Sequence, residues 1–344
     1  MKKKIAILGS TGSIGRSTFN IIKKNSNNYE IVLLTTNNNL KELYKQIKIF
    51  KVKNVIISSY SRYKKARSKL KNQNIKIYNN LNVISKIIKK RIDYTMCAIS
   101  GLAGLQPTLD SIKSSKRIAI ANKESIICAW NLIDKQLRKF KTEFIPIDSE
   151  HFSIWSLIKN YNNKNIDKIY ITASGGPFLK LPISKFNRII PKNATNHPRW
   201  KMGKKISIDS ATMMNKVFEV IEAQRIFNLN INKFQILIHP KSYLHAIVKF
   251  KNGLIKMLMH DTDMKIPIFN SLYVENEKIL KTNDIDLNSI NNLNLMEPNL
   301  NRFPALKILK KITNKISLFE TVVISANDEL VKYFLDGKIK FNEI

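Results

Sequence analysis

Cysteine is scarce in this sequence, with only Cys97 and Cys128 among 344 residues. Neither belongs to a CxxC pair, which argues against both a disulfide framework and a zinc site. We expect both side chains to be small hydrophobic residues of the core.

Long apolar runs are also missing, since none reaches the roughly 18 residues that a membrane span requires. Lys2–Lys4 lead directly into an expected strand at Ile5–Leu8, so we recognise no signal or transit peptide. The expectation is a soluble cytoplasmic protein without a membrane partner.

Acidic residues are few: 25 Asp and Glu stand against 59 Lys and Arg, a formal net charge of +34. Such an excess is typical of nucleic-acid-binding proteins. Here the bases are scattered among abundant Asn and Ile, a composition typical of A/T-rich codons, and no nucleic-acid-binding motif is found. We therefore expect no specific nucleic-acid partner, but a salt-dependent attraction for anionic substrates.

The length favours two or three domains, and the hydrophobic fraction of 44% suffices for a globular fold. Short apolar runs alternate with helical patterns through the first 150 residues, as in a doubly wound (Rossmann-like) parallel sheet. The expected strands are Ile5–Leu8, Ile31–Leu34, Val55–Ile57, Tyr94–Ile99 and Ile118–Ala121, and the expected helices are Thr18–Lys24, Lys41–Phe50 and Leu105–Ser114.

A second α/β region follows, and the predicted boundaries are 1–147, 148–282, an Asn-rich connector at 283–303, and a helical tail at 304–344. The strands expected in the second region are Lys168–Thr172, Gln235–Ile238, His245–Phe250 and Leu254–Met259. In the tail, helical spacing of apolar residues predicts a helix over Leu318–Leu335, with an apolar stripe formed by Leu318, Val322, Val323, Leu330, Val331 and Phe334.

A glycine-rich turn, Gly9–Gly15, follows the first strand and opens a helix. Glycines let the backbone approach a pyrophosphate, and the helix N-terminus supplies unpaired N–H groups. The spacing is GxxGxxG rather than GxGxxG, so a plain tight turn is the alternative. The second strand ends in Thr35–Asn39 without the acid that usually contacts the ribose of NAD, which favours NADP(H).

Three carboxylates are candidates for a metal site. Asp148 and Glu150 are two residues apart in an expected extended segment, where both face the same way. Hard cations such as Mg²⁺ and Mn²⁺ prefer such oxygen ligands. Ser207–Glu219 begins with capping residues and is expected to continue as one helix, on which Asn215, Lys216 and Glu219 share a face. A solvated acidic pair and an ordinary surface helix are the alternatives.

Two further segments have the composition of a binding site. Thr172–Phe178 is a glycine-rich turn that exposes a hydroxyl group and backbone amides. His197–Gly203 carries a His, a Trp and a Gly between helical stretches, which suits a loop that closes over a substrate.

Together these segments closely resemble the 1-deoxy-D-xylulose 5-phosphate reductoisomerase family. The matching motifs are GSTGSIG from Gly9, ANKES from Ala121, PIDSEH from Pro146, SGGPF from Ser174, HPRWKMG from His197, KISIDSATMMNK from Lys205 and HPKSYLHA from His239. The resemblance implies an N-terminal NADPH domain, a central catalytic domain that also forms a homodimer, and a C-terminal helical domain, shortened here because the chain ends at Ile344.

The family's reaction rearranges a phosphorylated sugar, 1-deoxy-D-xylulose 5-phosphate, and then reduces the aldehyde with NADPH to 2-C-methyl-D-erythritol 4-phosphate, an isoprenoid precursor. By resemblance, a divalent metal, Mg²⁺ or Mn²⁺, is held by Asp148, Glu150 and Glu219. Residues expected at the substrate are Lys123, Ser149, Glu150, Ser174, His197, Ser210, Asn215, Lys216 and Glu219. Those expected at NADPH are Thr11, Gly12, Ser13, Ile14, Asn39, Asn122, Glu124 and Gly203. Catalytic roles fall to Lys123 and the three carboxylates, with His151 and His245 as proton-transfer or orienting groups.

Two departures from the family pattern stand out. Asn37–Asn39 offers no base at the cofactor turn, which predicts a smaller preference for NADPH than the family usually has, and Lys265 stands where the family has Arg. A generic NAD(P)-dependent oxidoreductase would explain the first domain alone. A decayed family member is the other rival, although every expected metal and phosphate residue is present.

Overall fold

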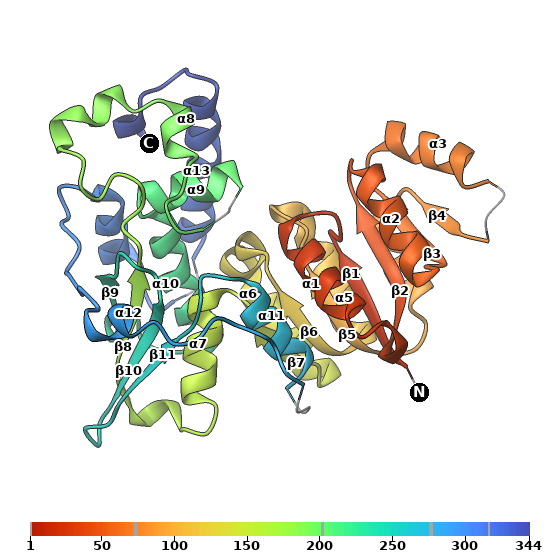
Figure 1. Cartoon of the computed structure of the whole chain (residues 1–344), viewed down its shortest axis with the longest axis horizontal. Coiled ribbons are helices and arrows are strands. Elements are labelled where there is room, and N and C mark those ends of the chain that lie inside the picture. The colour runs from red at the N-terminus through yellow and green to blue at the C-terminus, as the bar shows by residue number, and fades with distance from the viewer. Residues whose placement is uncertain (1, 72–73, 201–202, 275–277, 316) are drawn as a thin grey trace. The chain divides into compact units, whose positions relative to one another are not determined.

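The computed structural model describes residues 2–71, 74–200, 203–274, 278–315 and 317–344 (Figure 1). The chain forms two compact units: unit 1 comprises Met1–Asp148 and Met264–Leu280, and unit 2 comprises Ser149–Asp263 and Lys281–Ile344. The sequence-based boundaries need one correction, because residues 264–280, assigned to the second domain, pack with unit 1. Among the described residues, no helix combines the length and apolarity needed to cross a membrane.

Unit 1 is built on a seven-stranded sheet in the order β4-β3-β2-β1-β5-β6-β7, and all of its strand pairs are parallel. This confirms the predicted doubly wound α/β fold. The strands are β1 (Lys3–Leu8), β2 (Tyr29–Thr36), β3 (Asn54–Ile57), β4 (Lys76–Tyr78), β5 (Ile92–Cys97), β6 (Ser115–Ile120) and β7 (Glu143–Pro146). The short edge strands β4 and β7 were not predicted as strands.

The predicted helices of unit 1 are present, together with others that the sequence analysis did not name. They are α1 (Ser13–Lys23), α2 (Leu40–Phe50), α3 (Tyr60–Lys69), α4 (Ile84–Ile87), α5 (Leu105–Ser114), α6 (Lys123–Phe140) and α11 (Lys265–Leu272). Helix α11 joins this unit because Ile268, Phe269 and Leu272 are buried in its core. The hydroxyl groups of Tyr94 and Ser271 also lie 2.8 Å apart. Cys97 is buried, whereas Cys128 is only partly so, and neither forms a disulfide in the described part of the chain.

The strand order reverses at β1, which is flanked by β2 on one side and β5 on the other. In such sheets a crevice opens at the carboxyl ends of the strands where the order reverses, and ligands bind there. The glycine-rich turn follows β1 directly, so the fold places it at this crevice.

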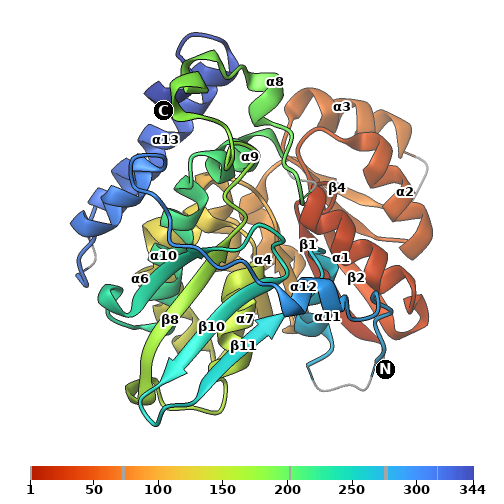
Figure 2. The same ribbon diagram turned by 60° about the vertical axis from the view of Figure 1, so that its left-hand side comes forward.

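Unit 2 contains a four-stranded sheet in the order β11-β10-β8-β9 (Figure 2), in which only β8 and β9 run parallel. Its strands confirm the four predicted ones: β8 (Ile166–Ala173), β9 (Phe234–Ile238), β10 (Leu244–Phe250) and β11 (Ile255–Met259). One face is covered by α7 (Ser149–Ile158) and α10 (Met214–Phe227), whose Ile154, Val220 and Phe227 pack on Ile169 and Val248 of the strands.

The predicted single helix over Ser207–Glu219 is wrong, because two helices occupy this stretch. Helix α9 (Lys204–Ala211) ends before Thr212, and α10 begins at Met214. Between them Met213 takes a left-handed conformation with φ 65°, and the Met214 amide donates to the Thr212 hydroxyl oxygen. The break has no Gly or Pro, so the usual sequence signal for it is missing.

The connector contains α12 (Leu287–Asn291) and a β-bridge between Met296 and Ile238 of β9. The tail is helical as predicted: a 3-10 segment at Pro304–Lys311, then α13 (Phe319–Leu335), then a 3-10 turn at Phe341–Glu343. The predicted apolar stripe needs correction, because Leu318 and Val322 are exposed. The buried residues of α13 are Glu320, Ile324, Asn327, Val331 and Phe334. The short helix α8 (Pro191–Ala194) also belongs to unit 2.

Candidate active site

The glycine-rich turn of unit 1 depends on glycine at two positions. Gly9 has φ +75°, and a Cβ there would lie 2.7 Å from the carbonyl carbon of Ala98. A Cβ on Gly15 would lie 2.6 Å from the Cα of Ser10. Both neighbours are backbone and cannot move aside, so these glycines permit a turn that any side chain would force open.

Two residues outside the motif hold this turn in place. The Gly9 amide donates to the Thr35 hydroxyl at 2.7 Å, and the Ser10 amide donates to the Thr35 carbonyl at 2.9 Å. The buried Gln46 side-chain amide donates to the carbonyl of Ser10 at 2.9 Å. Sequence reasoning missed Thr35 and Gln46, which lie 25 and 36 residues beyond Ser10.

The other cofactor candidates of unit 1 lie at strand and helix ends. The turn leads into α1 at Ser13, and the hydroxyl groups of Thr11 and Thr36 lie 2.7 Å apart. Asn122 follows β6, caps α6 by accepting from the Ser125 amide at 2.6 Å, and donates to the Gly101 carbonyl at 2.6 Å. Glu124 lies in the first turn of α6. Asn39 caps α2, accepting from the Glu42 amide. Gly203, the remaining cofactor candidate, lies in unit 2, where it precedes α9.

Asp148, Glu150 and Glu219 come together as the sequence predicted, with one ligand oxygen from each within 4.8 Å of the others. The predicted extended geometry is wrong, however, because α7 starts at Ser149 and Glu150 lies in its first turn. Asp148 lies only two residues before Glu150, so the local chain sets the distance between these two carboxylates. The chemistry of this donor set, three carboxylates around one point, fits a hard divalent cation.

Two lysines neutralise most of this acidic charge. The Lys123 ammonium lies 2.5 Å from Asp148, and the Lys216 ammonium lies 2.6 Å from Glu150 and 2.5 Å from Glu219. Burial disfavours the charged form of Lys216, but the two carboxylates outweigh it and raise the pKa of the ammonium. Three carboxylates and two ammonium groups carry a net charge of about −1, which a divalent cation would turn to about +1. Asn215 also contacts Glu219, and the Ser149 hydroxyl donates to Glu150 at 2.5 Å.

Two histidines that the sequence singled out are buried among neighbours. The His151 Nε2 atom lies 2.8 Å from the backbone carbonyl oxygen of Glu219 and so ties α7 to α10. The His245 ring stacks on that of His260 with centroids 3.7 Å apart, and its Nε2 lies 3.2 Å from the His260 carbonyl oxygen. These contacts favour an orienting role over proton transfer, most clearly for His151.

The glycine-rich turn of unit 2 meets the end of α9. Gly176 has φ +69°, and a Cβ there would lie 2.8 Å from the Cα of Ala211 and 3.0 Å from the carbonyl oxygen of Ser210. Ser174, two residues earlier, accepts from the Gly176 amide at 3.1 Å. The close approach at Gly176 therefore brings the turn that carries Ser174 against Ser210 and Ala211 at the end of α9.

His197 anchors the beginning of its loop to this turn. Its Nδ1 accepts from the amides of Arg199 and Trp200, so Nε2 carries the proton that it shares with the Ser174 hydroxyl at 3.0 Å. Burial, helped by the positive charge of Lys216, lowers the pKa of His197 to about 4, and the ring is therefore neutral at pH 7. Trp200 packs edge-on against His245. Lys201 and Met202, the rest of the predicted loop, lie outside the described residues.

Taken together, fold and site define a class of protein: a two-unit α/β protein with a dinucleotide-type parallel sheet and a carboxylate cluster suited to a divalent cation. Family models agree with this class and narrow it. The model described as 1-deoxy-D-xylulose 5-phosphate reductoisomerase matches residues 5–130, its C-terminal domain matches 144–227, and the DXP reductoisomerase C-terminal domain matches 259–344.

Individual relatives extend the match over the full chain. The 1-deoxy-D-xylulose 5-phosphate reductoisomerase of Pelagibacter ubique is 60% identical over 99% of this chain and 89% of its own length. The Zymomonas mobilis enzyme, solved in complex with NADPH, is 34% identical with a TM-score of 0.89 over 100% of this chain and 89% of the other. A DOX-P reductoisomerase in complex with NADPH, fosmidomycin and magnesium is 33% identical with a TM-score of 0.88, covering 99% and 86%. The chain belongs to the 1-deoxy-D-xylulose 5-phosphate reductoisomerase family.

Proposed function

We propose that this chain rearranges 1-deoxy-D-xylulose 5-phosphate and reduces the product with NADPH to 2-C-methyl-D-erythritol 4-phosphate. The observation that carries the proposal is the convergence of Asp148, Glu150 and Glu219 beside Lys216, in a chain of this family. A generic NAD(P)-dependent oxidoreductase would have no use for this cluster. A decayed member would have no reason to keep it intact.

The three carboxylates would hold one Mg²⁺ or Mn²⁺, which when bound supplies Lewis-acid polarisation of the substrate carbonyl. The chain's own groups prepare that position. Lys123, at the start of α6, keeps its ammonium against Asp148 and offers a positive charge near the reacting oxygens. The Ser149 hydroxyl orients Glu150 by donating to its carboxylate. His151 holds the α10 backbone at Glu219, which fixes the third carboxylate relative to the other two.

Ser174, His197, Ser210, Asn215 and Lys216 would bind the substrate phosphate. Hydroxyl, amide and ammonium groups are the donors that a phosphate needs, and Gly176 brings the Ser174 turn against Ser210. A neutral His197 with its proton on Nε2 can donate without adding charge. The +34 net charge of the chain would further favour an anionic substrate at low salt.

NADPH would bind at the crevice of unit 1, with its pyrophosphate on the turn and on the N-terminus of α1 at Thr11–Ile14. Asn39, Asn122 and Glu124 would surround the rest of the cofactor, and Gly203 is the further NADPH contact that the family resemblance implies. The end of β2 offers the 2′-phosphate no acid to repel it.

The loop from His197 to Gly203 would close over bound substrate and exclude water, with Trp200 covering the reacting carbons. The contacts of His197 with the Ser174 turn support this, because they hinge the loop on the phosphate-binding residues.

One assay tests the proposed function. Purified protein is given 1-deoxy-D-xylulose 5-phosphate and NADPH, with Mg²⁺, with Mn²⁺ or with a chelator, and NADPH consumption is followed while the product is identified by mass spectrometry. We expect metal-dependent formation of 2-C-methyl-D-erythritol 4-phosphate. NADPH consumption without this product would favour the generic oxidoreductase. A folded protein that binds NADPH but yields no product with either metal would favour a decayed member.

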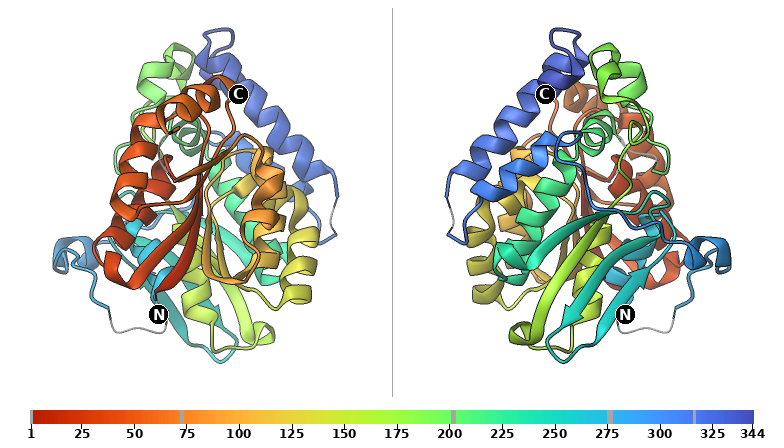
Figure 3. Two further views of the ribbon diagram at one scale, coloured as in Figure 1. Left: turned by 90° about the vertical axis from the view of Figure 1, so that its right-hand side faces the viewer. Right: turned by 90° about the vertical axis from the view of Figure 1, so that its left-hand side faces the viewer.

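We also propose that the enzyme is a homodimer joined through the face of the second sheet opposite α7 and α10, where β11 is exposed. Ile247 pairs with Met257 and Tyr170, so these three side chains share the face that α7 and α10 leave uncovered. Strands β10 and β11 lie side by side in Figure 3. Ile255 and Met257 are 57% and 48% exposed there, an apolar surface that a second copy would bury. Met257→Lys should give a monomer in analytical ultracentrifugation, whereas a wild-type monomer would refute the dimer.

We further propose that the enzyme works in the cytoplasm, because its reaction consumes NADPH. Recovery of the activity in the membrane pellet rather than in the soluble fraction of source cells would contradict this.

A further inference from the structure

Helix α13 carries no residue of the proposed site, yet its buried stripe is not wholly apolar. Glu320, Ile324, Asn327, Val331 and Phe334 recur every three or four residues and face inward. Two of these five are polar, and each is bound to a different helix that carries site residues. A purely packing role would not need polar groups at these positions, because burying them costs free energy unless they are paired.

The first link joins α13 to α9. The Asn327 side-chain amide donates to Asp209 at 2.8 Å, and both residues are buried, 2% and 3% exposed. The other Asp209 oxygen lies 2.9 Å from the Lys205 ammonium, which also lies 3.0 Å from Asp328. Asp209 immediately precedes Ser210 of the proposed phosphate site, so this link fixes the turn of α9 from which Ser210 projects.

The second link joins α13 to α10. The Arg225 guanidinium lies 2.6 Å from Glu320, and the side chains are only 6% and 1% exposed. The Ser317 hydroxyl donates to the other Glu320 oxygen at 2.6 Å. Arg225 stands on the helix that carries Asn215, Lys216 and Glu219, so both site helices are bound to α13 (Figure 2).

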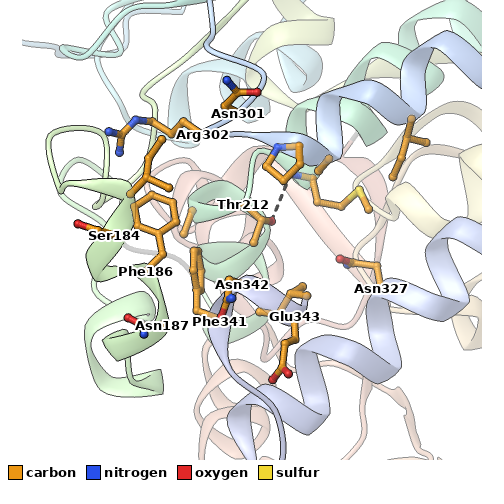
Figure 4. A pocket seen from close by; sticks show the side chains of 17 residues that line it. Ser184, Phe186, Asn187, Thr212, Asn301, Arg302, Asn327, Phe341, Asn342 and Glu343 are labelled. Carbon is orange, nitrogen blue, oxygen red and sulfur yellow. Dashed lines mark hydrogen bonds between the residues drawn. The ribbon is translucent and has the colours of Figure 1, made fainter.

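The junction between α9 and α10 needs such links. It contains the left-handed Met213, a conformation that costs a non-glycine residue about 1–2 kcal/mol. It also borders a cavity of about 670 Å³, whose lining includes Ala211, Thr212, Met214 and Asn327 (Figure 4). Ala211 packs in an apolar cluster with Phe178 and Val331, and Asn327 of α13 lines the same cavity, where it adds a polar link to that packing.

We propose that Asn327 is a positioning residue that, through Asp209, holds the α9–α10 junction in the conformation that binds the substrate phosphate. This deepens the proposed function and rests on it for the identity of the phosphate site. Because Asn327 acts through Asp209 next to Ser210, its removal should weaken phosphate and substrate binding more than NADPH binding, since among the proposed NADPH contacts only Gly203 borders α9.

The test compares Asn327→Ala with Val331→Ala, a matched control that shortens a buried side chain on the same stripe without breaking a polar link. Affinity for inorganic phosphate is measured by calorimetry, KM and kcat are measured for substrate and NADPH, and Tm is recorded. For Asn327→Ala we expect the phosphate Kd and the substrate KM to rise about 2- to 30-fold, with a smaller change in the NADPH KM. For Val331→Ala we expect a lower Tm with phosphate affinity unchanged.

A swapped pair sharpens the test. Asn327→Asp sets two carboxylates against each other and should weaken phosphate binding further. Adding Asp209→Asn restores one donor and one acceptor and should recover part of the affinity. If Asn327→Ala does not fold, Asn327→Ser takes its place. Equal phosphate affinity in Asn327→Ala and Val331→Ala, or no recovery in the swapped pair, would overturn the proposal. Calorimetry needs no turnover, so a wild type that binds phosphate but makes no product contradicts the proposed function and leaves this inference standing.

Discussion

The glycine-rich turn of unit 1 (Gly9–Gly15) and the charged cluster that begins at Asp148 are built in opposite ways. The turn consists of backbone, short hydroxyl groups and glycines whose missing Cβ atoms leave room for close approach. The cluster consists of charged side chains from the N-terminal parts of α6, α7 and α10, together with Asp148, which directly precedes α7. In the glycine-rich turn, the space around the backbone determines which residues are tolerated. In the charged cluster, the balance of positive and negative charge determines it.

This difference predicts different kinds of failure. A backbone site tolerates most side-chain changes but not an added carbon at a contact point. A buried charged site tolerates changes of shape better than the loss of one partner, because the remaining charge is then left without compensation.

The largest expected effect is on the charged cluster. Glu219→Gln removes one of three carboxylates and leaves the Lys216 ammonium with one partner fewer. We expect kcat/KM with Mg²⁺ to fall roughly 10²- to 10⁴-fold. Binding of Mn²⁺, followed by electron paramagnetic resonance, should weaken in parallel. Glu329→Gln on the exposed side of α13 is the control and should change neither value. Unchanged metal-dependent turnover in Glu219→Gln would show that Glu219 is not a metal ligand.

Next comes a pair of substitutions in the glycine-rich turn of unit 1. Gly15→Ala places a Cβ against the backbone of Ser10 and should destabilise the protein by about 1–3 kcal/mol, measured by urea unfolding, and abolish NADPH binding. At Gly12 the nearest atom to an added Cβ is 3.4 Å away. Gly12→Ala should therefore keep its stability and weaken NADPH binding only. Equal stability of the two variants would show that the turn is less crowded than its geometry indicates.

A smaller effect concerns the pH dependence of stability. The pKa of His197 is about 4 in the folded chain, below its ordinary value of 6.5, because the ring is buried. The unfolded chain then binds more protons between these values, so stability falls as the pH drops from 6.5 towards 4. His197→Gln removes this contribution, and its urea midpoint should fall less than that of the wild type over this window.

Asn196→Gln, at the exposed neighbouring position, is the control for that measurement and should follow the wild-type curve. Parallel curves for wild type and His197→Gln would mean that the ring is protonated as easily in the folded chain as in the unfolded one.

The smallest expected effect is on cofactor choice. We expect NADPH to be preferred to NADH in kcat/KM, by less than is usual in the family, because Asn37–Asn39 carries no base. Asn37→Asp adds a negative charge at the end of β2 and should lower the preference by less than about tenfold, as expected for an exposed charge. Asn25→Asp, in the turn before β2, should leave the ratio unchanged. Equal use of both cofactors by the wild type would show that the missing acid does not set the preference.

Much of the fold was predictable because its signals are local. Apolar runs of the right length predicted the central strands, and the Gly9–Gly15 turn between a strand and a helix predicted a pyrophosphate-binding site. The edge strands β4 and β7 were missed, because β4 has only three residues and β7 contains a proline. The break at Met213 was missed because a left-handed methionine has no local signature and persists only where the surrounding structure holds it.

The sequence by itself therefore determined the doubly wound sheet, the family motifs and the identity of the candidate carboxylates. Only the tertiary structure decided that Glu150 reaches Glu219 from the start of a helix, that α11 packs with unit 1, and that α13 is bound to both site helices. The physical reason is the sequence distance over which each signal acts. Periodicity is local and reports which side of an element is buried. Asp209 and Asn327 are 118 residues apart, and their pairing depends on how whole helices pack.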